Sequence, residues 1–127
     1  MWIFSKYGFF SIVKGNGESI QVRARKRKDL VNLLIASNLF KHPIRDDLGT
    51  DYAYRVFVSK EQLADVMLAL GDSLDYRNFK NMIHNTPDQV DKLPILHHLW
   101  ADMFHYQGEH KESHAFSGED CFAAQER

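Results

Sequence analysis

The sequence predicts an α+β fold: a small antiparallel sheet with helices packed on one face, followed by a C-terminal helical pair. Residues 1–28 are rich in aromatic and β-branched residues and contain a strong hairpin signal. Residues 52–58 repeat the strand pattern after a loop at residues 40–50, and apolar residues at helical spacing lie on both sides of this region. A ferredoxin-like variant is the nearest common arrangement for such an order of elements.

Two or three strands are expected before the first helix. Residues 2–14 form either one long strand bent at Gly8 or two short strands. The turn Gly15-Asn16-Gly17 predicts a hairpin because these residues tolerate a positive φ. Residues 20–25 then return antiparallel. Two alternatives stay open, in which either Phe10 and Ile12 or Phe9 and Val13 share a face with Val22.

Capping residues mark three of the expected helices. Asp29 is expected to cap a helix over about residues 30–39. Ser59 and Gln62 match a capping box for the next helix, which has a long apolar stripe. Asp75 is expected to cap a third, shorter helix.

The last helix is expected to begin at the capping signature Thr86-Pro87-Asp88-Gln89. It runs to about residue 106, and Pro94 either kinks it or restarts it. The periodicity then stops, so residues 1–107 are predicted to be a single α+β domain and residues 108–127 a flexible polar tail.

Length and composition indicate one globular domain. The chain has 127 residues, of which 44% are hydrophobic and 26% charged. No apolar run approaches the roughly 18 residues of a membrane-spanning helix, so no membrane partner is expected. The N-terminus lacks the pattern of a secretory signal. Cys121 is the single cysteine, which excludes an internal disulfide and favours a cytoplasmic location.

Positive charge is concentrated near the N-terminus. Residues 1–28 carry seven basic side chains and one acidic side chain, a net charge of +6 in a chain whose net charge is −1. Arg23 and Arg25 alternate with apolar residues and so lie on one strand face, about 7 Å apart. The guanidinium group matches the geometry of phosphate and carboxylate. The segment therefore predicts a face that binds anions.

Neighbouring residues extend this candidate site. The basic run continues toward the first helix, and tyrosines on the strand at residues 52–58 offer a stacking surface. The residues expected to bind are Arg23, Arg25, Arg27, Tyr52, Tyr54 and Arg55. The alternative is a solvated face on which acids such as Asp29 and Asp51 pair with the arginines.

Neither a cofactor nor a metal ion is expected, and catalysis has no positive signal. Cys121 has no fixed histidine neighbour, so it is not expected to act as a nucleophile. A loose group of potential zinc ligands lacks any known zinc-ligand spacing. This group consists of His98, Asp102 and His105 at positions i, i+4 and i+7, with His84, His110 or His114 available to complete it.

Short motifs that mix aromatic and polar residues run along the chain. They are Met1-Trp2, Gly8-Phe9-Phe10-Ser11, Val22-Arg23-Ala24-Arg25, Asp51-Tyr52-Ala53-Tyr54-Arg55, Asp75-Tyr76-Arg77-Asn78-Phe79-Lys80 and Trp100. In this order they resemble a family of small bacterial proteins without an established activity, over most of residues 1–107. The resemblance draws attention to the polar positions Ser11, Arg23, Arg25, Asp51, Tyr54, Arg55, Asn78 and Lys80, and it adds Lys80 to the expected binding residues.

Three hypotheses for function follow. The first is a non-enzymatic module whose basic strand face binds a nucleic acid or a nucleotide-like ligand. The second is a regulatory factor that uses the same surface to bind an acidic protein. The third is a small hydrolase or transferase, which is metal-dependent if His98, Asp102 and His105 assemble. The apolar side of the last helix also allows a homodimer.

Overall fold

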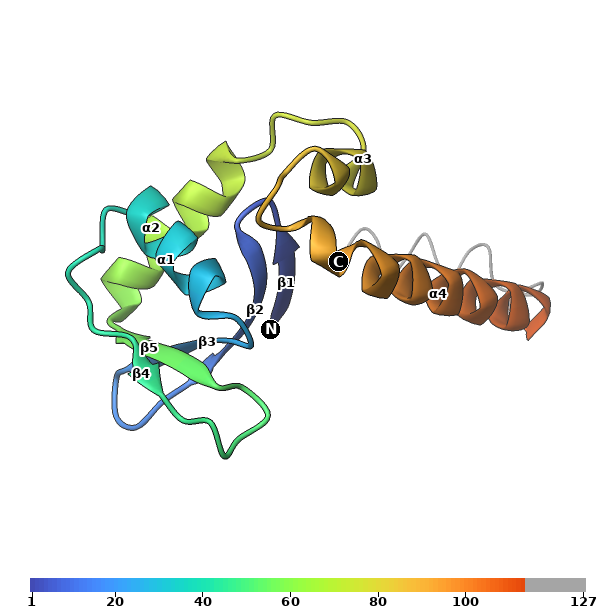
Figure 1. Ribbon diagram of the computed structural model, residues 1–127. Coiled ribbons are helices and arrows are strands. Elements are labelled where there is room, and N and C mark those ends of the chain that lie inside the picture. The colour runs from blue at the N-terminus through green and yellow to red at the C-terminus, as the bar shows by residue number, and fades with distance from the viewer. Residues whose placement is uncertain (114–127) are drawn as a thin grey trace. The chain divides into compact units, whose positions relative to one another are not determined.

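The computed structural model describes residues 1–113, with side chains to residue 108, and it has the predicted α+β class (Figure 1). The predictions for Cys121, His114 and the rest of residues 114–127 lie outside the described residues. Residues 1–91 form one compact unit, and a second unit begins at Lys92. The elements are β1 (Trp2–Ser5), β2 (Gly8–Lys14), β3 (Ile20–Ala24), α1 (Arg27–Ala36), β4 (Arg45–Asp46), β5 (Tyr54–Val58), α2 (Lys60–Asp72), α3 (Phe79–His84), the 3-10 helix η1 (Val90–Lys92) and α4 (Leu93–Ser113).

The five strands form one antiparallel sheet in the order β1-β2-β3-β5-β4. Three strands precede α1, whereas a ferredoxin-like fold has the order β-α-β-β-α-β, so that more specific expectation is wrong. Residues 2–14 form two strands, which meet in a turn before Gly8. The two-residue strand β4 lies in the predicted loop at residues 40–50, where it is too short to produce a visible alternation.

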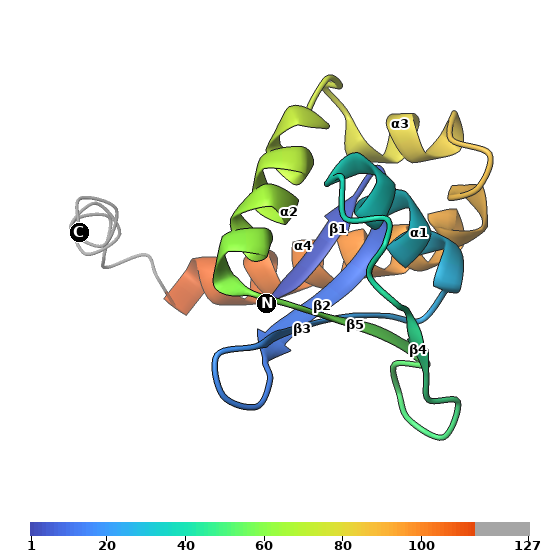
Figure 2. The same ribbon diagram turned by 90° about the vertical axis from the view of Figure 1, so that its left-hand side faces the viewer.

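The register places the hydrophobic core on one face of the sheet. Ile12 pairs with Val22, and Val22 pairs with Val56, so Phe10 and Ile12 share the face of Val22. Helices α1 and α2 cover this face (Figures 1 and 2). Burying each such side chain contributes about 1.5–3 kcal/mol to folding. The buried cluster consists of Phe10, Ile12, Val22, Ala24, Leu30, Leu33, Leu34, Val56, Val58, Val66 and Leu70.

The start of α2 agrees with prediction, but the start of α1 does not. Ser59 and Gln62 form the expected capping box, with both reciprocal hydrogen bonds present. Lys26 occupies the N-cap position of α1, and Asp29 lies in its first turn. The prediction that Asp29 caps this helix is therefore wrong, because its carboxyl group bonds outside the helix.

The cap of α3 is also different from the predicted one. The Asn78 side chain accepts a hydrogen bond of 3.0 Å from the backbone amide of Asn81 and so occupies the cap position. Asp75 lies before the helix, and its carboxylate pairs with Lys6 instead. The capping prediction for Asp75 is wrong because a distant lysine, which the local sequence does not reveal, holds this side chain.

The segment before α4 is more irregular than predicted. Thr86 donates its hydroxyl hydrogen bond back to the carbonyl oxygen of Met82, and η1 separates this residue from the long helix. Pro94 is the second residue of α4, where its missing N–H group has no helical partner to lose. Of the two alternatives, Pro94 thus restarts the helix. The helix continues to Ser113, past the predicted end at about residue 106.

Asp29 joins three segments of the first unit. The side chain is only 2% exposed, and its Oδ2 atom accepts a hydrogen bond of 3.2 Å from the backbone amide of Phe9. Its Oδ1 atom accepts one of 3.0 Å from Gln89 Nε2, which also donates to the carbonyl oxygen of Tyr7 at 3.0 Å. Because buried polar groups are costly unless they are hydrogen-bonded, these contacts fix the β1–β2 turn and the segment before η1 to α1.

Gly8 is required at this turn. Its φ angle is 150°, a region that L side chains rarely adopt. A Cβ atom at this position would overlap the carboxyl group of Asp29. The same turn therefore needs both the carboxyl group and the absence of a side chain beside it.

We expect Gly8→Ala to lower the free energy of unfolding by roughly 3 kcal/mol, because overpacking and backbone strain each cost about 1–3 kcal/mol. Urea-induced unfolding measures this change. The control is Gly71→Ala in α2, where a Cβ would meet open space. This variant is expected to be as stable as the parent or up to about 1 kcal/mol more stable. Equal midpoints for Gly8→Ala and the parent would contradict the role given to the contact.

Candidate functional site

A row of polar and basic side chains crosses the sheet on the face opposite α1 and α2. The register pairs Ser11 with Arg23, Arg23 with Arg55, and Arg55 with Arg45. Directly paired residues share a face, so arginines from β3, β5 and β4 lie side by side. Like charges in directly opposite positions destabilise a sheet. An anion bound over this row would relieve that repulsion.

Arg23 and Arg25 are both held against the ring of Tyr52. Their Cζ atoms lie 4.6 Å and 4.2 Å from the ring centroid. Such cation–π contacts contribute about 0.5–2 kcal/mol each. Tyr52 is only 3% exposed, so its ring supports the two guanidinium groups rather than offering a surface to a ligand. This role differs from the stacking surface that the sequence predicts for the tyrosine.

Aromatic rings continue the site across β2 and β1. The ring of Phe9 lies 5.5 Å from Arg25 Cζ and stacks on Phe4, with centroids 4.4 Å apart and an interplanar angle of 17°. Trp2 contacts Phe9 edge to face at 6.0 Å. Phe4 is 37% exposed and Trp2 is 70% exposed. We call the combined surface of Trp2, Phe4, Phe9, Arg23, Arg25 and Tyr52 the arginine–aromatic face.

The guanidinium groups of this face retain hydrogen-bonding capacity. Arg23 Nη2 donates to Ser11 Oγ at 2.7 Å. Its Nε atom is buried and has no hydrogen-bond partner within the described chain, so only the Nη groups could reach a ligand. Arg25 is exposed. Neither arginine forms an ion pair with any residue in the described part of the chain. The alternative, in which nearby acids pair with the arginines, therefore does not describe Arg23 and Arg25, whereas Arg55 does have an acidic partner in Asp47.

Arg55 has a structural role in the loop between β4 and β5. It donates hydrogen bonds to Gln21 Oε1 at 3.2 Å, to Thr50 Oγ1 at 3.0 Å and to the carbonyl oxygen of Tyr52 at 3.3 Å. A carboxylate oxygen of Asp47 lies 3.8 Å away. These contacts hold the loop so that the Tyr52 ring meets the two other arginines.

Three of the predicted binding residues lie outside this site. Tyr54 pairs with Ala24 and packs against the hydrophobic core, on the face that α1 and α2 cover. Arg27 is the exposed first residue of α1, and Lys80 lies in α3. The tyrosines differ because Tyr52 precedes the regular strand and does not follow its alternation.

The described residues contain no metal-binding cluster. No group of three or more His, Cys, Asp or Glu side chains in this part of the chain could hold a metal ion. His98, Asp102 and His105 therefore do not assemble a site by themselves. None of the helices in the described chain combines the length and the hydropathy that crossing a bilayer requires.

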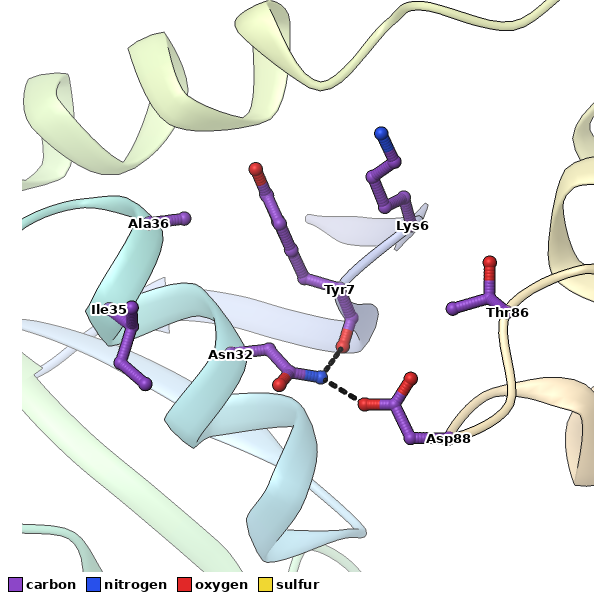
Figure 3. Close-up of a pocket in the computed structure, with 7 residues that line it drawn as sticks. All are labelled: Lys6, Tyr7, Asn32, Ile35, Ala36, Thr86 and Asp88. Carbon is purple, nitrogen blue, oxygen red and sulfur yellow. Dashed lines mark hydrogen bonds between the residues drawn. The ribbon is translucent and has the colours of Figure 1, made fainter.

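A pocket of about 400 Å³ lies beside the β1–β2 turn (Figure 3). Asn32 Nδ2 donates to the carbonyl oxygen of Tyr7 at 3.1 Å and to Asp88 Oδ2 at 2.8 Å across its floor. The side-chain NH₂ group of Asn32 is thus already hydrogen-bonded within the protein. The lining residues are Lys6, Tyr7, Asn32, Ile35, Ala36, Thr86 and Asp88.

A second hollow, of about 460 Å³, contains much of the Asp75-to-Lys80 motif. Lys6 Nζ donates to both carboxylate oxygens of Asp75, at 2.9 Å and 2.8 Å, and this bonding lowers the pKa of Asp75. Burial raises the pKa of Tyr76, so its hydroxyl group stays protonated at neutral pH. The charge of Lys6 is therefore balanced locally. The motif residues do not share one pocket, since Asn78 lies here and Arg23 lies on the sheet.

Sequence reasoning misses the aromatic half of the site. It predicts Trp2, Phe4 and Phe9 only as strand residues, without a binding role. The alternation of side chains along β1 and β2 could have placed these residues on the outer face. This prediction requires knowing which of Phe9 and Phe10 faces the core. Arg45 is missed because β4 is not predicted.

Comparison with known proteins gives no relative. No protein-family model, no curated protein and no solved structure matches this chain.

Proposed function

We propose that this protein binds single-stranded nucleic acid on the arginine–aromatic face. The observation that carries the proposal is that Arg23 and Arg25 lie on Tyr52 beside the stacked rings of Phe4 and Phe9. Sheets that bind single strands combine these two features, because bases stack on aromatic rings and basic groups contact the phosphates.

Phe4 and Trp2 would provide the stacking surface. Both remain accessible, and Phe9 holds the Phe4 ring in a parallel stack. A base stacked on an aromatic side chain contributes about 1–3 kcal/mol to binding. This contribution depends little on sequence because every base has a π-face. The surface therefore supports binding with low sequence preference.

Arg23 and Arg25 would contact the phosphates. The aromatic rings beneath them fix the guanidinium planes, and the N–H groups at the edges of a guanidinium can still donate to phosphate oxygens. The exposed side chains of Lys26, Arg27 and Lys28 continue the positive charge beyond β3. Such a basic path attracts a polyanion and makes its binding sensitive to salt.

Two competing ligands fit the face less well. In a duplex the bases are paired and stacked on each other, so their faces are not available to Phe4. An acidic protein would satisfy the arginines but would leave the exposed rings of Trp2 and Phe4 without a comparable partner. The rings therefore favour a single strand over both.

The double substitution Arg23→Ala/Arg25→Ala is expected to weaken binding of a mixed-sequence oligonucleotide. It should also lower the slope of log K against log salt by about 0.7 for each phosphate that the variant no longer neutralises. Fluorescence anisotropy at several salt concentrations measures both quantities.

The matched control for the arginines is Lys41→Ala/Lys60→Ala. It removes the same charge from exposed positions that lie outside β3 and the sheet face. This variant should keep most of the affinity and nearly the parent slope. If both double substitutions weakened binding equally, the net charge of the protein alone would explain the affinity, and a defined site would be ruled out.

Phe4→Ala is expected to weaken binding of the same oligonucleotide by roughly 5- to 150-fold, which corresponds to the loss of one stacked base. The salt slope should not change, because no charge is removed. Phe40→Ala is the control, since Phe40 is 59% exposed and lies between α1 and β4, outside the residues that form the face. If Phe4→Ala bound as tightly as the parent while an acidic peptide displaced the oligonucleotide, the acidic-protein hypothesis would replace this one.

A further inference from the structure

Helix α4 carries a broad apolar face that is accessible to solvent. The six side chains concerned are between 37% and 64% exposed. They span about three turns of the helix and include two aromatic rings, of Trp100 and Phe104, that stack 5.3 Å apart at an interplanar angle of 8°. The face consists of Ile95, Leu99, Trp100, Met103, Phe104 and Tyr106.

These side chains lie on one half of the helix circumference. At about 100° per residue, Met103 and Leu96 fall near the middle of the apolar arc, with Ile95 and Phe104 at its edges. Leu96 is only 7% exposed and does not contribute to the accessible face. The opposite arc carries the polar side chains His97, His98, Asp102 and His105. The apolar face therefore contains no charged group, and two copies could meet on it without like-charge repulsion.

The accessible area is sufficient for a small self-association interface. Full burial of an aromatic side chain removes about 200 Å² from water. For an aliphatic side chain the area is roughly 100 Å², which follows from its free energy of burial at about 25 cal/mol per Å². Multiplied by the exposed fractions of the six side chains, these areas give the face an accessible apolar area of about 500 Å². Two copies would bury about 1,000 Å², which is the lower limit for a specific interface. The largest apolar patch on a monomer is commonly about 300–600 Å² and often marks an interaction site.

We infer that α4 is a dimerisation helix, whose apolar face packs against the same face of a second copy of this chain. A twofold pairing uses one patch twice and needs no further surface. An interface at the lower limit of size for specific interfaces is typical of weak association, so we expect the dimer to form only as the protein concentration rises. This inference does not depend on the proposed binding of nucleic acid.

Sedimentation velocity of the full chain over a wide range of concentrations tests the inference. The protein is first freed of nucleic acid with nuclease and high salt, so that a bound strand cannot bridge two copies. The parent chain should shift from monomer to dimer as its concentration rises. Met103→Glu places a charge at the centre of the face and should keep the chain monomeric throughout.

The matched control is His98→Glu, which adds an acidic group to the opposite side of the same helix. It should dimerise like the parent. Trp100→Ala provides a second disruption without a charge and should weaken the dimer at least tenfold. Circular dichroism checks that each variant keeps the helical content of the parent.

Two results would overturn the inference. One is a parent chain that stays monomeric at every concentration. The other is a dimer that Met103→Glu and His98→Glu affect equally, since the interface would then lie elsewhere on the chain.

Discussion

The buried carboxyl group of Asp29 is the contact on which the rest of the first unit depends. It accepts hydrogen bonds from Phe9 and Gln89, segments that are far apart in sequence. Through Phe9 it fixes the start of β2, and with it the phase of the alternation that sends Phe9 to one face and Phe10 to the other. The core and the arginine–aromatic face thus depend on the same hydrogen bond between Phe9 and Asp29.

The fold class and the basic strand could be predicted because both depend on local patterns. Alternation in residues 20–25 is enough to place Arg23 and Arg25 on one face, and the Ser59–Gln62 box is read directly from spacing. What could not be predicted depends on tertiary contacts. Their positions in the sequence make Asp29 and Asp75 resemble helix caps. In the structure their carboxyl groups instead accept hydrogen bonds from Phe9, Gln89 and Lys6.

Only part of the candidate site can be predicted from the sequence, because the rest also depends on tertiary contacts. Tyr52 and Tyr54 look equivalent in sequence, two residues apart, but only Tyr54 lies in the regular strand and packs on the core. Tyr52 lies in an irregular segment that Arg55 holds, and its ring turns to the arginines. On the sheet face, the buried ring of Tyr52 therefore supports the two arginines, and exposed rings of β1 complete the surface.

The two-residue strand β4 has a consequence for how the molecule behaves at high concentration. An edge strand offers unpaired backbone groups to other chains and can seed fibrous aggregates. β4 is very short, and both Arg45 and Asp46 are exposed and charged. Another strand added there would gain few hydrogen bonds and would have to bury charge. This border of the sheet is thereby protected against edge-to-edge growth, even though the adjoining face carries aromatic rings.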